Sequence, residues 1–532
     1  MTGSKDKGLD MIERIDAKLL YPQNKFYLDY IAGRGAAPSF FTHQIDRFAE
    51  AVDARSRVDY PREAVCDRLY EYNARIASDP TAVLANIADL RENDTLCVIS
   101  GQQVGLLGGP VYTIYKIITT IRLAASLQER LRIRVVPLFW LADEDHDFTE
   151  INLARFLKED GEVGTVSFEW EERGRPIADL PITDEVLRAY RAYMEALPPS
   201  PHHAHVREIF APDQAEDYST WHARLFSQIF SSHGLIVLTP SLLREPGRDF
   251  LRSALQQRES IQDHLIEAAE RLRVAGYEPA LSPERAGTLY TADAAGRRIR
   301  VIDPLSHLAA VEEYPDRYSP DAALRPLFAD ALLPIAASVL GPGEIVYHAL
   351  LKPLYPLFSI PQPLLFPRAS YTVLSRAEAK LIARFGMNVG DLLSEAFTVE
   401  GTLRSLVPPN LQERFAVVRA AISADLAPLR PLVAALDPNL ERSWKGAHAT
   451  SLHALDRLEG RALRAGLAQH GLSSGALRRL RNIILPRGRP QERVLPLPHF
   501  INKYGPGFID RLFAAGELDD FSHSVITGDD ND

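Results

Sequence analysis

Residues 98–152 combine a glycine-rich turn, an amphipathic helical pattern and an acidic loop, and they constrain the fold of this chain more than any other stretch. The apolar run at 95–100 has the length and character of a buried strand, and Pro110 stands where helices tend to begin. Apolar residues then recur at helical spacing over 111–131, and the nearly continuous apolar run at 133–141 is typical of a strand covered on both faces of a parallel sheet. The stretch therefore predicts a βαβ unit.

The glycine-rich loop and the acidic run Asp-Glu-Asp-His-Asp at 143–147 are expected to be neighbours in space. A right-handed crossover places the two strands parallel, so the loops after their carboxyl ends lie at the same edge of the sheet. Glycines let backbone N–H groups approach a ligand closely, and the free N–H groups at a helix start favour phosphate or carboxylate. Carboxylates across the crevice would hold Mg²⁺ or orient an amine. This arrangement predicts a nucleotide site.

Each of the two motifs also has a structural interpretation. The glycine spacing matches neither a Walker A loop nor Gly-x-Gly-x-x-Gly, so a turn without a ligand stays open beside an anion-binding loop. For the acidic run, a solvated surface stays open as an alternative, although its position after a buried strand favours a catalytic or metal-binding site.

Composition narrows the class of function. A chain of 532 residues with 46% hydrophobic and 24% charged residues is ordinary globular protein, and its length predicts on the order of two or three domains. The net charge of -10 argues against a broad nucleic-acid surface. Because no apolar run approaches about 18 residues and the first residues lack a secretory apolar segment, we expect a cytoplasmic protein that does not bind a membrane. The two cysteines cannot form a disulfide framework or a zinc site. Because the charge argues against nucleic acid, a small-molecule substrate fits better.

A second anion-friendly segment lies at 341–370. Gly341-Pro342-Gly343-Glu344 precedes a helical pattern, and such a helix start favours an anion. Arg368 follows an extended, proline-rich run and is suited to gripping a carboxylate or phosphate, although a surface ion pair stays open for it.

The rest of the chain is predicted to be largely helical. A single long helix is expected over 247–274, and apolar residues recur every three or four positions over 411–440, interrupted by Pro428 and Pro431. The latter pattern predicts a helical region with an antiparallel hairpin, and both an ordinary helical domain and a projecting dimerisation arm stay open. We expect the segment after about 486 to pack back on the core and to end in a flexible tail from Gly528 onward.

Four separate motifs, in order, resemble the family of the bacillithiol biosynthesis cysteine-adding enzyme, BshC. They are Ser-Gly-Gln-Gln-Val-Gly-Leu-Leu-Gly-Gly-Pro-Val-Tyr-Thr-Ile-Tyr-Lys (100–116), Val-Pro-Leu-Phe-Trp-Leu-Ala-Asp-Glu-Asp-His-Asp-Phe-Thr-Glu-Ile-Asn (136–152), Gly-Pro-Gly-Glu-Ile-Val-Tyr (341–347) and Pro-Arg-Ala-Ser (367–370). The resemblance runs through nearly the whole chain, including Gln491-Glu492-Arg493 near its end.

The resemblance implies an α/β fold with a Rossmann-like parallel-sheet core over 1–370, which carries an insertion at about 153–215. It also implies a C-terminal α-helical coiled-coil region over 371–485 that forms a homodimer, followed by a C-terminal segment over 486–532. The implied reaction is the addition of L-cysteine to the glucosamine amine of glucosaminyl-malate, which forms bacillithiol.

Amide formation from the cysteine carboxylate needs activation, which ATP or another nucleotide, together with Mg²⁺, would supply through an adenylate or an acyl phosphate. We favour the adenylate by analogy with other amino-acid-activating enzymes that share this type of crevice. The candidate catalytic residues are Lys116, Asp145, His146, Asp147 and Arg368, of which Asp145 and Asp147 are also the candidates for Mg²⁺. The candidate substrate-binding or nucleotide-binding residues are Ser100, Gly101, Gln102, Gln103, Gly105, Gly108, Gly109, Tyr112, Trp140, Glu144, Asn152, Gly341, Gly343, Glu344, Tyr347 and Ser370.

In this hypothesis Lys116 or Arg368 stabilises charge in the transition state. His146 is the candidate base because its unperturbed pKa lies near neutrality, and a structural role stays open for it. Two other functions also stay open. A nucleotidyltransferase would release pyrophosphate without needing cysteine, and a dimeric nucleotide-binding scaffold would bind nucleotide without turnover.

Overall fold

The computed structural model describes residues 10–172, 174–405, 409–469 and 471–528. These residues form two compact units. Unit 1 contains the described residues up to Glu159, Val163–Ser375 and the residues from Arg489 onward, and unit 2 contains Asp160–Glu162 and Arg376–Gly488. No helix among the described residues is long and apolar enough to cross a lipid bilayer.

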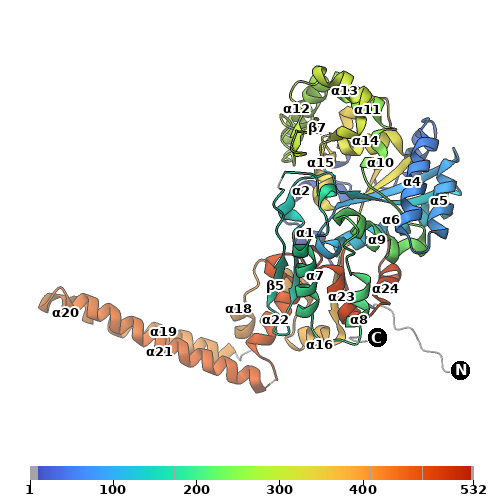
Figure 1. Cartoon of the computed structure of the whole chain (residues 1–532). Coiled ribbons are helices and arrows are strands. Elements are labelled where there is room, and N and C mark those ends of the chain that lie inside the picture. Colours follow the sequence, from blue (N-terminus) through green and yellow to red (C-terminus); the bar gives the residue numbers. More distant parts are fainter. Residues whose placement is uncertain (1–9, 173, 406–408, 470, 529–532) are drawn as a thin grey trace, which may run out of the picture. The chain divides into compact units, whose positions relative to one another are not determined.

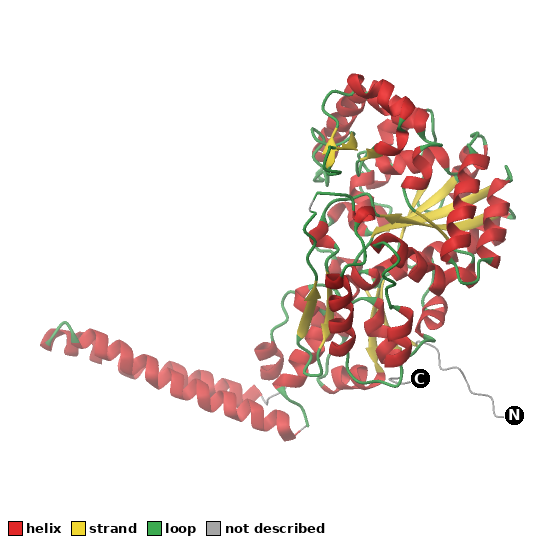
Figure 2. Ribbon diagram, in the orientation of Figure 1, coloured by secondary structure: helices red, strands yellow, loops and turns green. Residues whose placement is uncertain are grey.

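Unit 1 is built on a five-stranded parallel sheet in the order β11-β10-β2-β3-β6 (Figure 2). The strands are β2 (Thr95–Gln103), β3 (Arg134–Ala142), β6 (Ile236–Leu238), β10 (Ile335–Leu340) and β11 (Leu364–Pro367). The strands predicted at 95–100 and 133–141 are therefore confirmed, and they pair in parallel as the βαβ interpretation requires. The helix predicted over 111–131 is α6 (Tyr112–Leu131), which connects them.

Alternate residues of the central strands face two separate apolar cores. Cys97 and Ile99 of β2 pack in the core that contains α4 (Arg62–Ile76) and α5 (Thr81–Arg91). Val98 packs in the opposite core, with α6 and α3 (Phe48–Ser56). Since both faces of the sheet are covered by helices, its strands are nearly uniformly apolar, as parallel strands of this kind are.

The order of the strands creates a switch point between β2 and β10. From β2 the chain adds β3 and β6 on one side of the sheet and later returns to add β10 and β11 on the other side. The connections from β2 and into β10 therefore leave in opposite directions, which opens a crevice at the carboxyl ends of these two strands. Ligands of open α/β sheets bind at such a point.

Two long connections interrupt the sheet. Between β3 and α9 (Tyr218–Phe230) lie β4 (Leu153–Leu157), β5 (Val163–Ser167), α7 (Asp184–Ala196) and α8 (His203–Ile209). Between β6 and β10 lie α10 (Ser241–Arg244), α11 (Arg248–Gln256), α12 (Arg258–Val274), β7 (Leu289–Ala292), β8 (Arg298–Arg300), α13 (Leu308–Glu313), β9 (Ser319–Pro320) and α14 (Leu324–Leu332). The remaining helices of this unit are α1 (Ala17–Leu20), α2 (Lys25–Ile31), α15 (Pro342–His348), α23 (Leu497–Tyr504) and α24 (Phe508–Ala514).

The prediction of one helix over 247–274 is wrong, because the helix is broken at Gln257 into α11 and α12. The Gln257 side chain donates to Ser253 Oγ and to the carbonyl of Leu357. The first helix packs on α13 and α14, whereas the second packs on the turn at Lys352–Phe358. The two helices therefore pack against different elements, and helical periodicity in the sequence does not reveal the break between them.

The C-terminal segment completes a second, three-stranded sheet in unit 1. Its last strand, β13 (His523–Gly528), lies between β1 (Asp10–Ile15), to which it is antiparallel, and β12 (Tyr371–Ser375), to which it is parallel. Residues 371–375 thus form a strand and not the start of the helical region, because β13 supplies them with a partner. The flexible tail was expected to begin at Gly528, but Gly528 is the buried last residue of β13 and pairs with Ser375. The rest of the expected tail, 529–532, lies outside the described residues.

Unit 2 contains an antiparallel helical hairpin, drawn in orange in Figure 1. α19 (Pro409–Leu426) runs to a turn with α20 (Leu429–Leu436), and α21 (Leu440–Gln469) returns beside both. The remaining helices of this unit are α16 (Arg376–Arg384), α17 (Val389–Leu393), α18 (Val399–Ser405) and α22 (Ser474–Ile484). Ion pairs from Arg419 to Asp456 and Glu459 hold the two long helices together, so the predicted helical hairpin is confirmed.

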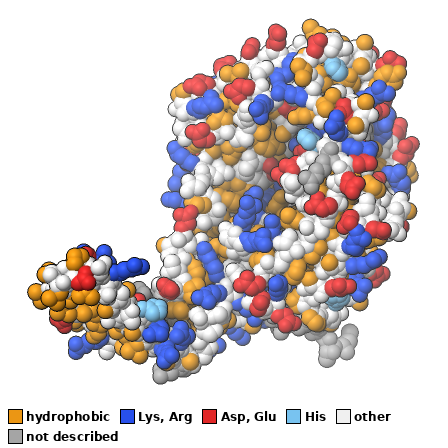
Figure 3. All heavy atoms as spheres, turned by 60° about the vertical axis from the view of Figure 1, so that its left-hand side comes forward, with side chains coloured by type: hydrophobic (Ala, Val, Ile, Leu, Met, Phe, Trp, Pro, Cys, Tyr) orange, Lys and Arg blue, Asp and Glu red, His pale blue; other side chains and the backbone are white. Residues whose placement is uncertain are grey.

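The end of this hairpin exposes apolar side chains. Leu432 is 63% exposed and Leu436 is 83% exposed, both in α20. Figure 3 shows apolar side chains, in orange, gathered on the surface of the hairpin. A hairpin with such a surface is suited to pairing with another apolar surface.

Candidate functional site

A cavity of about 520 Å³ lies at the carboxyl ends of β2, β3 and β10, where the strand order reverses. We call it the switch-point crevice. Its polar lining residues are Ser100, Gln102, Gln103, Trp140, Asp145, Glu150, Arg325, Asp330, Ser338, Glu344, Tyr347 and His348, and the backbone of Gly101 also lines it. The predicted edge of the sheet is thus the edge that carries the cavity.

A second cavity of about 220 Å³ adjoins the crevice, and three residues, Gln102, Glu344 and Tyr347, line both. We call it the basic cavity because Lys116, Arg368 and Arg493 line it. Tyr112, Gly341, Pro342 and Gly343 complete its lining. Two ligand groups bound side by side would therefore meet at a shared polar wall.

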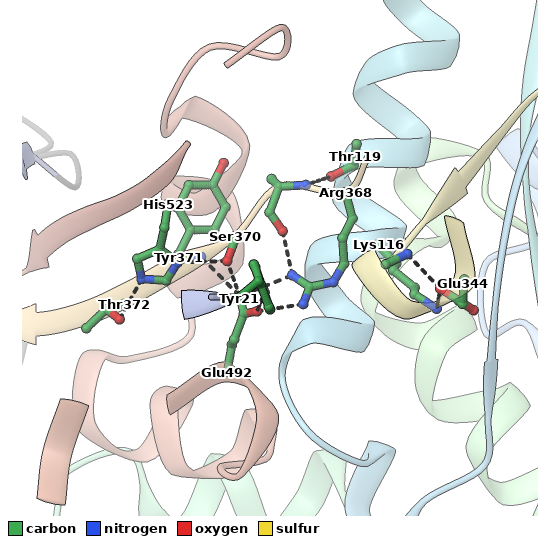
Figure 4. A network of polar contacts seen from close by, with 12 residues as sticks. Tyr21, Lys116, Thr119, Glu344, Arg368, Ser370, Tyr371, Thr372, Glu492 and His523 are labelled. Atoms are coloured by element: carbon green, nitrogen blue, oxygen red, sulfur yellow. Dashed lines mark hydrogen bonds and ion pairs between the residues drawn. The ribbon is translucent and has the colours of Figure 1, made fainter. Parts of the chain in front are cut away.

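Lys116 is held at this wall by three contacts, of which Figure 4 shows the ion pair with Glu344. The side chain projects from α6, is 2% exposed, and its Nζ lies 2.6 Å from Glu344 Oε2. The Nζ also donates to the carbonyl of Gly101 at 2.8 Å and to Gln102 Oε1 at 2.9 Å. Burial lowers the pKa of Lys116, and Glu344 opposes that shift. Burial would raise the pKa of Glu344, but Lys116 outweighs burial and holds it below its usual value, so the two form an ion pair.

Gly341 leaves open the space in which these charged groups converge. A Cβ at this position would lie 3.2 Å from Glu344 Oε2, 3.7 Å from Arg368 Nε and 4.0 Å from Lys116 Cε. Its N–H donates to Glu344 Oε2 at 2.6 Å. The helix that follows, α15, has only seven residues. The absence of a side chain at Gly341 therefore lets the charged side chains around it approach one another closely.

Arg368 forms a buried ion pair with Glu492 through both of its Nη atoms (Figure 4). Its Nη2 lies 2.6 Å from Glu492 Oε1 and its Nη1 lies 3.1 Å from Oε2. Burial disfavours the charge on both groups, but each partner outweighs burial: the pKa of Arg368 is raised and that of Glu492 is lowered. The sequence left a surface ion pair open for Arg368, whereas this pair is buried.

Ser370 extends this network to the last strand. Its Oγ donates to Glu492 Oε2 at 2.9 Å and lies 2.7 Å from His523 Nδ1, while Thr372 Oγ1 lies 2.8 Å from His523 Nε2. Burial lowers the pKa of His523 to about 4, so its imidazole is neutral at physiological pH. Ser370 thus supports Arg368 and lines neither cavity.

Most of the glycine loop builds a tight turn and does not line either cavity. Gly101 faces the crevice, but Gly105, Gly108 and Gly109 are buried. A Cβ on Gly105 would lie 2.9 Å from Gly109 Cα, and Gly108 and Gly109 have φ of +86° and +68°. The N–H of Val111 donates to the carbonyl of Leu495 at 2.9 Å. The C-terminal segment therefore accepts a hydrogen bond from one of the N–H groups at the helix start that the sequence assigned to an anion.

The acidic loop divides into a buried part and an exposed part. Asp143 accepts a hydrogen bond from Ser219 Oγ at 2.6 Å, and burial raises its pKa to about 7. Glu144 is also buried, and its Oε2 lies 3.5 Å from Arg244 Nη2. Neither carboxylate lines the crevice.

Asp145 is the member of this loop that lines the crevice together with Glu150. Burial would raise the pKa of Asp145, but the Arg298 guanidinium at 3.8 Å and the N–H of His146 lower it, so the carboxylate is ionised. His146 and Asp147 are exposed and line neither cavity. The Asp147 carboxylate instead accepts hydrogen bonds from Thr149 N and Oγ1.

Several buried polar atoms of the crevice have no hydrogen-bond partner among the described residues. They are Ser100 Oγ, Gln103 Nε2, Trp140 Nε1 and His348 Nδ1. Buried polar groups are nearly always paired, so these atoms are the ones a ligand would satisfy. Asn152, by contrast, donates to the carbonyl of Phe168 and so ties down the inserted segment away from both cavities.

Several site residues were not among the candidates from sequence. Glu150, Arg325 and His348 line the crevice, Arg493 lines the basic cavity, and Glu492 holds Arg368. Burial lowers the pKa of His348 to about 4, which keeps it neutral. The Gln491-Glu492-Arg493 motif was the available signal for two of these residues, whereas no local pattern distinguished Arg325 from the other arginines.

A Mg²⁺ ion that arrives with nucleotide phosphates needs only one or two protein carboxylates. Among the described residues, no three His, Cys, Asp or Glu side chains converge as a metal cluster. Asp145 and Glu150 both line the crevice and could hold such an ion beside a nucleotide. Asp147, the other candidate from sequence, does not line the crevice.

Comparison with known proteins finds two family descriptions that together match nearly the whole chain. The description "Bacillithiol biosynthesis BshC, N-terminal Rossmann-like domain" matches residues 12–369, and "Bacillithiol biosynthesis BshC, C-terminal coiled-coil domain" matches residues 371–527. The predicted Rossmann-like core and coiled-coil region are thereby confirmed.

Curated relatives carry the name "Putative cysteine ligase BshC". The protein of Geobacillus kaustophilus (strain HTA426) is 31% identical over 535 residues, which cover 94% of this chain and 97% of that protein. The protein of Geobacillus thermodenitrificans (strain NG80-2) is 29% identical, with 94% of this chain and 97% of that protein covered. The protein of Salinibacter ruber (strain DSM 13855 / M31) is 29% identical, with 94% and 95% covered.

Proposed function

This chain belongs to the BshC family of bacillithiol biosynthesis, and from that premise we propose that it is a cysteine ligase that joins L-cysteine to the amine of glucosaminyl-malate. The observation that supports the proposal most strongly is the pair of adjoining cavities that share Gln102, Glu344 and Tyr347 at the switch point. A ligase must hold an activated acyl group next to an amine, and two cavities with a common wall provide that arrangement.

The proposed reaction proceeds through an adenylate. An oxygen of the cysteine carboxylate attacks the α-phosphorus of ATP, and pyrophosphate leaves. The amine nitrogen of glucosaminyl-malate then attacks the acyl carbon, AMP leaves with the electron pair of the broken bond, and the amine loses a proton. An acyl phosphate would differ in that ADP and phosphate are the products.

Crevice residues have distinct roles in this proposal. Ser100, Gln103 and Trp140 contribute the buried polar atoms that bind ligand oxygens or nitrogens. Lys116 stabilises negative charge that develops during acyl transfer, because its ammonium is fixed at the shared wall before substrate arrives. Asp145 is ionised and either positions the amine or, together with Glu150, holds Mg²⁺. Mg²⁺, when bound by Asp145 and Glu150, would neutralise phosphate charge.

We also propose that the protein is a homodimer formed through the α19–α21 hairpin. Support comes from exposed apolar side chains along the hairpin, including Val417 at 58% and Leu436 at 83% exposure. A second copy offers an identical surface, so one symmetric contact would cover both.

Product analysis tests the function directly. The purified protein is mixed with ATP, L-cysteine and glucosaminyl-malate, and bacillithiol is followed by mass spectrometry while AMP and ADP are separated by chromatography. We expect bacillithiol and AMP in equal amounts. Pyrophosphate release that does not need cysteine would indicate a nucleotidyltransferase, and nucleotide binding without any product would indicate a scaffold; either outcome contradicts the proposal.

A further inference from the structure

Three cationic side chains line the basic cavity, and carboxylates neutralise two of them. Lys116 is paired with Glu344, and Arg368 is paired with Glu492. The side chain of Arg493 makes no hydrogen bond or ion pair to a described residue, and its guanidinium carbon lies 5.6 Å from the centre of the Tyr112 ring. The cavity therefore has an unneutralised positive charge at its exposed side.

The buried side of the cavity presents an unused donor. Both Nη atoms of Arg368 bond to Glu492, which leaves its Nε–H, and this atom is buried without a hydrogen-bond partner. Gly341 keeps the space in front of the Nε open, since a Cβ there would approach it to 3.7 Å. A buried donor without a partner is costly, so its persistence at a cavity wall points to a ligand.

We propose that the basic cavity is an anion subsite that binds one carboxylate or phosphate group of a substrate between Arg368 Nε–H and Arg493. This inference rests on the proposed function, because the cavity shares its wall with the crevice in which the ligation occurs. A volume of about 220 Å³ accommodates a small anionic group and not a whole nucleotide. The two sources of such a group are the malyl carboxylates of the amine substrate and a nucleotide phosphate.

Glu492 is the positioning residue of this subsite. Besides the two bonds from Arg368, it accepts hydrogen bonds from Ser370 Oγ at 2.9 Å, from Tyr371 N at 3.2 Å and from Tyr21 Oη at 3.2 Å. It is 0% exposed, so this carboxylate is fixed in the interior. With both Nη atoms directed at Glu492, the edge of the guanidinium that remains toward the cavity is the Nε–H edge (Figure 4).

Anion binding by the full-length protein tests the subsite without requiring turnover. Calorimetric titrations use L-malate in one arm and inorganic phosphate in the other, each with wild type, Arg493→Gln and the matched control Arg489→Gln. Arg489 is exposed and lines neither cavity. We expect one of the two anions to bind wild type and the control equally and to bind Arg493→Gln at least tenfold more weakly. Malate binding would assign the subsite to the amine substrate, and phosphate binding would assign it to the nucleotide.

Either of two results would overturn the subsite: neither anion binds wild type, or Arg493→Gln binds as tightly as Arg489→Gln. These results differ from a failure of the proposed function, which would appear as absent bacillithiol in wild type whatever the anion titrations give. Glu492→Gln, checked for its fold by circular dichroism, should raise the KM of the substrate whose anion binds by at least tenfold while kcat changes less than threefold. An equal fall in kcat with an unchanged KM would refute the positioning role.

Discussion

Substitution of Lys116 by Met should separate the catalytic role of this residue from its structural role. The change keeps the length and most of the volume of a side chain that is 2% exposed, but it removes the ammonium 2.6 Å from Glu344. It also leaves the carbonyl of Gly101 and the Oε1 of Gln102 without this donor. We therefore expect losses in both stability and activity.

The stability loss can be bounded from the geometry. Two unit charges 2.6 Å apart attract by about 6 kcal/mol at an effective dielectric constant of about 20, and the desolvation of both groups cancels much of this. Removal of one partner from a buried pair typically costs about 3–5 kcal/mol. Because the Glu344 side chain is 30% exposed and keeps its bond from Gly341 N, we expect about 3 kcal/mol.

The activity loss should be larger than the stability loss can explain. Loss of a preorganised donor to developing charge lowers kcat by about 10²–10³-fold. The assay measures bacillithiol formation at saturating substrates, and denaturant unfolding measures stability. The double variant Lys116→Met/Glu344→Gln removes the unpaired carboxylate, so most of the stability should return while activity should not. Recovery of activity together with stability, or a single variant within threefold of wild-type kcat, would refute the catalytic role.

Three further predictions follow from burial and exposure. Burial raises the pKa of Asp143 to about 7 from 3.8, so the stability of the wild type should fall as pH rises from about 4 to 7. The Asp143→Asn variant should be more stable than the wild type by up to roughly 4 kcal/mol at pH 8 and equally stable at pH 4. Urea unfolding at both pH values measures this difference, and an equal gain in stability at pH 4 and pH 8 would contradict the prediction. His146→Ala should keep at least half of the wild-type kcat because the side chain is exposed and lines neither cavity; a loss above tenfold in the bacillithiol assay would restore it as the base. Leu432→Glu with Leu436→Glu should halve the molar mass in light scattering, and an unchanged dimer would exclude this end of the hairpin from the interface.

The sequence predicted the central βαβ unit because its signals are local. A strand with both faces buried is apolar at successive residues, and a helix buries every third or fourth residue. The local pattern of apolar residues therefore predicts the two strands and the helix at 95–100, 133–141 and 111–131. Handedness then placed the strand ends at one edge, where the switch-point crevice lies. The helical hairpin followed from its own periodicity in the same way.

Local pattern could not identify which residues of each motif face a ligand. Gly101 lines the crevice, but the glycines at 105, 108 and 109 close a turn, although all four stand in one glycine-rich loop. Asp145 lines the crevice, whereas Asp143 is bound by Ser219 outside its lining and Asp147 caps a turn. Neighbours along the chain diverge here because backbone direction in a loop is set by the segments that pack against it.

The chain by itself therefore determined the layers of unit 1 and the edge at which its site lies. Only the tertiary structure decided the composition of that site. Glu492 reaches Arg368 across 124 residues of sequence, and Arg325 enters the crevice from a helix in a long connection. Periodicity reports that a side chain is buried but not what it is buried against, and the charges of this site are set by such distant partners.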